Sequence, residues 1–144
     1  HKKKIMLEGK RYSFIEKRNS QGIPINMPYL PLTLNYGNRS LEVMGLLDTG
    51  ASVNVLPFDI GLQLGAVWEE QTTNIQLSGN LASSEARGLV LSAIIDDFAP
   101  VLLAFAWTKS TDAPLILGHM NFFNEFNVCF YRFDLAYELC PRQK

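Results

Sequence analysis

The sequence LLDTGAS, residues 46–52, ends an apolar run on an acidic turn. Asp48 directly follows two leucines, although an Asp in this position most often only caps a turn. Thr49 adds a hydroxyl group, and Gly50 permits close approach of the backbone to the carboxylate. Residues 53–56 then resume an apolar strand. A carboxylate held between two apolar strands is a candidate for acid–base chemistry.

The chain around this turn has the pattern of a β protein. Three prolines between residues 24 and 31 disfavour a helix, and residues 29–36 then alternate between apolar and polar side chains. A turn at residues 37–38 leads into a second strand at 41–47. We expect further strands at residues 53–56, 72–77, 86–96, 100–107, 115–117, 128–133 and 135–139, and short helices at 58–64 and 119–126. Many short strands with one or two short helices predict a mainly β fold of the closed-barrel type.

Length and charge limit the class of protein. The chain has 144 residues, 47% of them hydrophobic, with 13 basic and 14 acidic side chains. One domain with a sizeable core is expected, and the balanced charge argues against nucleic acid as a partner. Residues 1–18 carry seven basic and two acidic side chains, so residues 1–22 are expected to form a basic, partly ordered arm. Residues 23–144 are then the folded domain.

Neither cofactor nor metal is indicated by the sequence. Cys129 and Cys140 lack the spacing of a zinc site. They allow one disulfide, but two buried free thiols are the favoured interpretation. No apolar run reaches the roughly 20 residues of a transmembrane helix, and no signal peptide is visible. A cytoplasmic location is therefore favoured, while a removed leader or a membrane-anchoring segment outside this chain stays open.

Other catalytic chemistries lack their residues. His119 stands alone, and no serine lies in a Gly-x-Ser-x-Gly turn. A pairing of His119 with either cysteine is disfavoured because both cysteines lie in apolar, strand-like runs. The sequence also lacks the Gly-rich phosphate-binding loops of nucleotide enzymes. The chemistry therefore falls to the turn at residues 46–52.

This turn, together with Ile116-Leu117-Gly118 about 65 residues later, resembles the two motifs of the retropepsin family. These are single-domain aspartic proteases of retroviral type, and the resemblance covers roughly residues 28–140. The chain looks most like cellular, bacterial-type members. The resemblance implies the closed acid-protease barrel and an aspartic endopeptidase. It also implies an active homodimer, because one chain supplies a single catalytic Asp and the chemistry needs two carboxylates.

The resemblance also implies roles for the residues of the turn. Two Asp48 carboxylates, one from each chain, would share and activate the attacking water. Thr49 would hydrogen-bond across the two-fold axis, and Gly50 would accept the substrate backbone. The implied partners are a second copy of the chain and a peptide or protein substrate in extended conformation.

By the same resemblance, a hairpin over the cleft forms a flap that closes on the substrate. The expected flap and substrate-binding residues are Ala51, Ser52, Val53, Leu77, Ser78, Gly79, Asn80 and Leu81. The flap tip carries a single glycine, Gly79, where viral enzymes usually have several. An ordinary hairpin turn is the alternative interpretation.

The sequence departs from the viral enzymes in one further respect. Ser52 and His119 occupy positions where those enzymes tend to carry an ion pair that braces the site. A Ser–His hydrogen bond is a candidate substitute, and a lone structural or surface histidine is the alternative.

Two other functions compete with proteolysis. The first is a non-catalytic peptide-binding or dimerisation module that keeps the retropepsin barrel. The second is a β-barrel in which Asp-Thr-Gly occurs by coincidence. The intact Asp48-Thr49-Gly50 sequence favours the enzyme, because a binding module has no need of a carboxylate in this turn.

Overall fold

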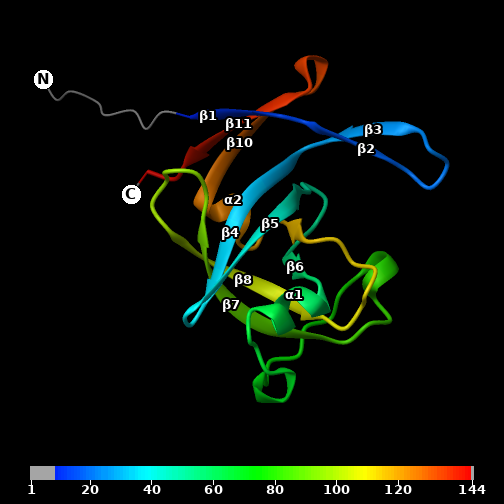
Figure 1. Ribbon diagram of the computed structural model, residues 1–144, viewed down its shortest axis with the longest axis vertical. Helices are drawn as coiled ribbons and strands as arrows, with labels where there is room; N and C mark the ends of the chain where they lie inside the picture. The colour runs from blue at the N-terminus through cyan, green and yellow to red at the C-terminus, as the bar shows by residue number, and fades with distance from the viewer. Residues whose placement is uncertain (1–8, 144) are drawn as a thin grey trace, which may run out of the picture.

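The computed structural model describes residues 9–143 and shows a six-stranded closed barrel with two smaller β elements beside it (Figure 1). The barrel strands follow the spatial order β4-β5-β9-β6-β8-β7, with β7 closing on β4. Their bounds are β4 (Tyr29–Tyr36), β5 (Arg39–Leu47), β6 (Asn54–Leu56), β7 (Ala86–Ile94), β8 (Val101–Thr108) and β9 (Ile116–Leu117). The predicted mainly β, barrel-like fold is confirmed.

The β4–β5 hairpin is the element whose sequence specifies it most clearly. Gly37 takes a positive φ of 59° in the turn, a conformation that glycine adopts without strain. Leu30, Leu32 and Leu34 point into the barrel and are at most 4% exposed. The alternation of side chains across a strand therefore places one face of β4 in the core.

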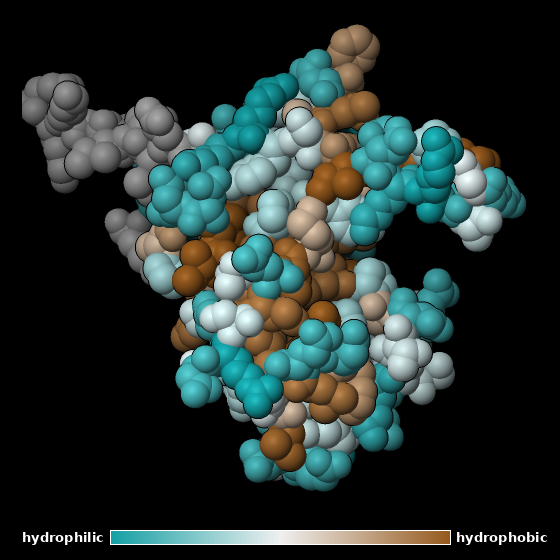
Figure 2. Space-filling view, viewed as in Figure 1, coloured by the Kyte–Doolittle hydropathy of each residue, from teal (hydrophilic) through white to brown (hydrophobic). Residues whose placement is uncertain are grey.

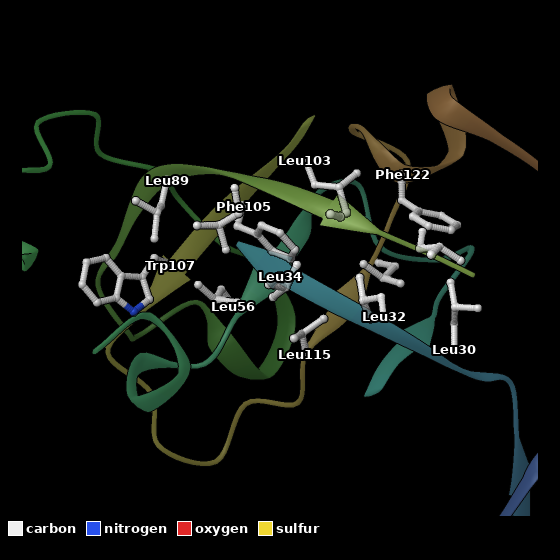
Figure 3. Close-up of a cluster of buried hydrophobic side chains, with 14 of the residues drawn as sticks. Leu30, Leu32, Leu34, Leu56, Leu89, Leu103, Phe105, Trp107, Leu115 and Phe122 are labelled. Atoms are coloured by element: carbon white, nitrogen blue, oxygen red, sulfur yellow. The ribbon is translucent and has the colours of Figure 1, made fainter. Parts of the chain in front are cut away.

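Large side chains from several strands fill the barrel (Figure 3). Phe105 and Trp107 on β8 are almost fully buried. The Trp107 ring stacks on Phe58 and meets Trp68 edge-on. Gly61 lies directly against this ring, and a Cβ at this position would collide with the Trp107 indole. Helix α1 (Phe58–Gln63) thus closes one side of the barrel.

Two β elements lie outside the barrel (Figure 1). Strands β1 (Lys10–Ser13), β11 (Ala136–Pro141) and β10 (Phe126–Tyr131) form a three-stranded sheet in that order. Strands β2 (Ile15–Arg18) and β3 (Pro24–Met27) form a projecting hairpin. In Figure 2 hydrophilic side chains cover much of this hairpin, whereas hydrophobic ones gather over the middle of the molecule.

The N-terminal arm is more structured from residue 10 onward than its composition indicates. The β1 strand pairs along β11, and Tyr12 stacks on Tyr137 with 5.3 Å between ring centroids. The boundary expected at residues 22–23 falls in the turn between β2 and β3. Residues 1–8 of the expected arm lie outside the described residues.

The two expected helices are present but short. Helix α1 ends where Gly65 takes a positive φ of 84°. Helix α2 (Phe122–Glu125) is a single turn and begins later than expected. Residues 119 and 120 are held in extended form instead, because their amides donate to the carbonyl oxygens of Ala51 and Ser52. No helix within residues 9–143 is long and apolar enough to span a membrane.

The strand expected at residues 72–77 is wrong. Only one bridge, between Asn74 and Arg87, links this segment to β7. Two backbone hydrogen bonds flank this bridge, from Ile75 to the Ala86 carbonyl oxygen and from Gly88 to the Thr73 carbonyl oxygen. Beyond them the Gln76 side chain donates to the carbonyl oxygens of Leu77 and Ala82, each at 3.0 Å. The candidate flap is therefore a loop and not a regular hairpin.

The burial expected for the cysteines is also wrong. Cys129 is exposed and Cys140 is half-buried, and both are free thiols. Cys129 lies on β10, an outer strand of the three-stranded sheet, where alternate side chains face outward.

Candidate active site

Backbone hydrogen bonds to the chain around β9 fix the start of the acidic turn. The amide of Leu46 donates to the Leu115 carbonyl oxygen at 2.9 Å, and the amide of Asp48 donates to that of Leu117 at 3.0 Å. Strands β5 and β9 run parallel here. The two motifs, far apart in sequence, are thus adjacent in space.

The Asp48 carboxylate is held by its own turn. Its Oδ1 accepts a hydrogen bond from the Gly50 amide at 2.9 Å, and the Asp48 carbonyl oxygen accepts one from Ala51 at 3.1 Å. Asp48 is half-buried, whereas Thr49 and Gly50 are exposed. Among residues 9–143, no salt bridge engages this carboxylate. The turn presents it to solvent in a fixed orientation.

A buried asparagine supports the turn from below. Asn54 is fully buried, and its Oδ1 accepts a hydrogen bond from the Gly118 amide at 2.8 Å. Its Nδ2 donates to the Ala104 carbonyl oxygen at 2.9 Å and to Asn121 Oδ1 at 3.2 Å. Asn121 in turn donates to the Leu102 carbonyl oxygen at 2.9 Å. Because Asn54 is fully buried, breaking these hydrogen bonds would leave its polar atoms without partners, and the network therefore favours one geometry.

Close packing explains the glycine of the second motif. A Cβ on Gly118 would come within 2.5 Å of the Val53 carbonyl oxygen and 2.7 Å of the Ala51 carbonyl oxygen. Both are backbone atoms that cannot rotate away. Only glycine therefore lets residues 118–120 lie along residues 51–54.

His119 contacts the turn, but through Thr49 and not through the candidate partner Ser52. Its Nε2 lies 2.7 Å from the Thr49 carbonyl oxygen, and its ring meets Phe123 edge-on at 5.3 Å. Because a carbonyl oxygen only accepts, Nε2 carries the hydrogen. Both neutral and protonated imidazole can supply that hydrogen. Ser52 instead accepts, through its carbonyl oxygen, from the Met120 amide.

A cleft of about 760 Å³ opens beside Asp48. Ten of the predicted site residues line it, and they come from the turn, the candidate flap loop and β9: Asp48, Gly50, Ala51, Ser52, Val53, Leu77, Ser78, Asn80, Leu81 and Ile116. In Figure 1 the loop after β5 and the green segment before β7 lie on the same side of the barrel. The structure therefore brings the turn and the predicted flap together.

The remaining predicted residues do not line the cleft. Leu117 and Gly118 are buried beneath the turn, and Thr49 and His119 contact each other at its edge. Gly79 is exposed at the tip of the candidate flap loop with a positive φ of 63°, and a Cβ there would meet no atom within 4 Å.

Sequence reasoning missed several residues of the site. Asn54 and Asn121 support the turn through hydrogen bonds, Gln76 closes the base of the candidate flap loop, and Asp112 lines the cleft. One signal was available, because a single Asn inside the apolar run at residues 53–56 is typical of a buried hydrogen-bonded amide. Within the described residues, no group of three or more His, Cys, Asp or Glu side chains is arranged to hold a metal ion.

Comparison with known proteins supports the fold. Neither the protein-family models nor the curated proteins include a match. Among solved structures, the crystal structure of a retropepsin-like aspartic protease from Rickettsia conorii matches with a TM-score of 0.61. The match covers 96% of each chain at 18% sequence identity. The chain has a retropepsin-like fold. At this identity the similarity establishes the fold alone.

Proposed function

We propose that the chain is an aspartic endopeptidase whose active site forms at the two-fold axis of a homodimer. The observation that carries the proposal is the position of Asp48. Its carboxylate lines a cleft of about 760 Å³ between the turn and the flap loop. Gly50 orients that carboxylate through a hydrogen bond of 2.9 Å.

The mechanism requires two copies of this carboxylate. One must accept a proton from water as the water attacks the peptide carbonyl, and the other must donate a proton to the carbonyl oxygen. Two carboxylates placed close together retain one shared proton, because both cannot ionise cheaply. Each chain offers one Asp48, and the exposed Thr49 and Gly50 leave the turn accessible to a second copy.

Other residues of the cleft are proposed to bind the substrate. Thr49 forms a hydrogen bond across the two-fold axis of the dimer, and Gly50 accepts a hydrogen bond from the substrate backbone. An extended peptide lies between the turn and the flap loop as an added strand. Ala51, Ser52 and Val53 contact it from the turn. Leu77, Ser78, Gly79, Asn80 and Leu81 close over it from the flap loop, which excludes water from the reaction.

Substitution of Asp48 tests the proposal. Asp48→Asn keeps the shape of the side chain and removes the base, so cleavage of a peptide library is expected to fall at least a hundredfold, the order of an acid–base contribution. Circular dichroism should show an unchanged fold. Activity of Asp48→Asn within tenfold of wild type would overturn the proposal. Peptide binding by wild type without any cleavage would favour a non-catalytic binding module.

A further inference from the structure

The cleft contains a second carboxylate besides Asp48. Asp112 lies in the loop between β8 and β9, next to Ser110 and Pro114, which also line the cleft. Asp112 is exposed, and no salt bridge within residues 9–143 engages it. The fifteen lining residues include no Lys, Arg or His. The cleft therefore presents negative charge without a compensating cation.

Two basic side chains, Lys109 beside this loop and Arg87 on β7, make other contacts. Lys109, three residues before Asp112, places its ammonium 5.1 Å from the Trp68 ring centroid. Arg87 lies 4.6 Å above the same ring and donates to the Trp68 carbonyl oxygen at 2.8 Å. Cation–π contacts and this hydrogen bond keep both side chains on the aromatic cluster. Neither is positioned to neutralise Asp112.

The rest of the lining suits an aliphatic stem. Val53, Val55, Leu77, Leu81 and Ile116 give the cleft an apolar wall. Lys and Arg bury their methylene groups on apolar surface while the charged end reaches a polar partner. A wholly apolar substrate side chain would instead shield the Asp112 carboxylate from water without pairing it.

We propose that Asp112 is a specificity residue that favours a Lys or Arg side chain in the substrate. This inference rests on the proposed function, since it assigns a substrate class to the same cleft. The charge of the chain after its basic N-terminal segment acts in the same direction. Residues 19–144 carry twelve acidic and six basic side chains, and the field of this part of the chain attracts cationic peptides.

The first test compares matched peptides that differ at one position beside the cleaved bond. Lys and norleucine have the same stem, and only Lys is charged. Wild type is expected to favour the Lys peptide in kcat/KM, and Asp112→Asn should lower the Lys-to-norleucine ratio about two- to fivefold, the range of an exposed ion pair. High salt should lower the wild-type ratio in the same way.

Asp59→Asn is the matched control, because it makes the same change at an exposed carboxylate on α1 outside the cleft. It should leave the ratio at the wild-type value. An equal ratio in wild type and Asp112→Asn, or an equal fall in both variants, would overturn the proposal.

A binding measurement separates this inference from the proposed chemistry. In the Asp48→Asn background, equilibrium binding of the Lys peptide should exceed that of the norleucine peptide, and adding Asp112→Asn should remove the difference. Equal binding of the two peptides, or binding of neither, would overturn the role of Asp112. Undiminished cleavage by Asp48→Asn would instead overturn the proposed function, while the binding ratio would still decide the inference.

Discussion

Single residues around the Asp48 turn act mainly by restricting its backbone. Gly50 orients the Asp48 carboxylate, Asn54 holds the Gly118 amide, and His119 contacts the Thr49 carbonyl oxygen. The donor–acceptor distance in each of these hydrogen bonds is below 3 Å. The turn is thereby prepared before a substrate or a second chain arrives, which is the condition for efficient positioning of reacting groups.

His119 should prove to be a positioning residue. His119→Leu removes the donor to Thr49 and is expected to lower the free energy of unfolding by about 1 kcal/mol, the net value of one hydrogen bond. It should also lower kcat/KM several-fold, because the turn loses its outer brace. His119→Gln retains an N–H donor and should restore most of both. Urea denaturation and peptide cleavage measure the two effects, and equal behaviour of the Leu and Gln variants would contradict this role.

Two glycines of the site should respond differently to the same substitution. Gly118→Ala drives a Cβ into the backbone of residues 51–53 and is expected to cost about 3 kcal/mol, at the upper end for overpacking. Gly79→Ala meets open space and bears only the strain of a positive φ, about 1 kcal/mol or less. Denaturant unfolding compares them, and equal losses would show that the close approach at Gly118 is relieved by movement of the turn.

At the scale of elements, the sequence pattern predicted those helices and strands whose stabilising interactions lie within the same short segment. The β4–β5 hairpin was predictable because alternation and a glycine turn specify it within 20 residues. The loop at residues 72–77 has strand-forming residues, but its pairing with β7 stops at one bridge and two flanking backbone hydrogen bonds. Helix α2 lost its first turn because distant amides and carbonyls hold residues 119 and 120 extended.

The candidate site divides in the same way. Asp48, Thr49 and Gly50 were found because their motif is contiguous. The contact of Asn54 with Gly118 joins residues 64 positions apart, and nothing in either local sequence specifies the partner. Asp112 lines the cleft because of the course of the β8–β9 loop, which the sequence alone did not reveal.

The attachment of β1 to the barrel should depend on pH. Lys10 contacts Asp97 at 2.7 Å and Asp96 at 3.4 Å. Hydrogen bonding to Lys10 lowers the pKa of Asp97 below 3.8, so this stabilisation is present above that pH and is lost as pH falls through the lowered value. Hydrogen bonding to Asp97 raises the pKa of Lys10 above 10.5, so the contribution is lost again as pH rises through the raised value.

Lys10→Met tests this attachment. Near pH 7 the melting temperature of the wild type should exceed that of the variant by only about one or two degrees, because the ion pair is exposed. The difference should shrink below about pH 4 and above about pH 10.5. A difference that stays constant across this range would assign the effect to the Lys10 stem and not to its charge.

At the scale of the whole molecule, one chain supplies half of what the proposed chemistry requires. One chain provides one Asp48, and its turn is exposed at Thr49 and Gly50. The fold agrees with that of a retropepsin-like aspartic protease over nearly the full length of both chains. The central claim is therefore that two copies of the chain build one active site.

Mixing of wild type with Asp48→Asn tests this claim most directly. Wild type is held at a constant concentration well above that needed for association, and the variant is added and allowed to exchange subunits. Because a mixed dimer retains one Asp48, activity should fall to roughly half at an equal amount of variant and to roughly a tenth at a ninefold excess, as random pairing requires. Activity that stays constant at every ratio would show that each chain works alone and would contradict the shared site.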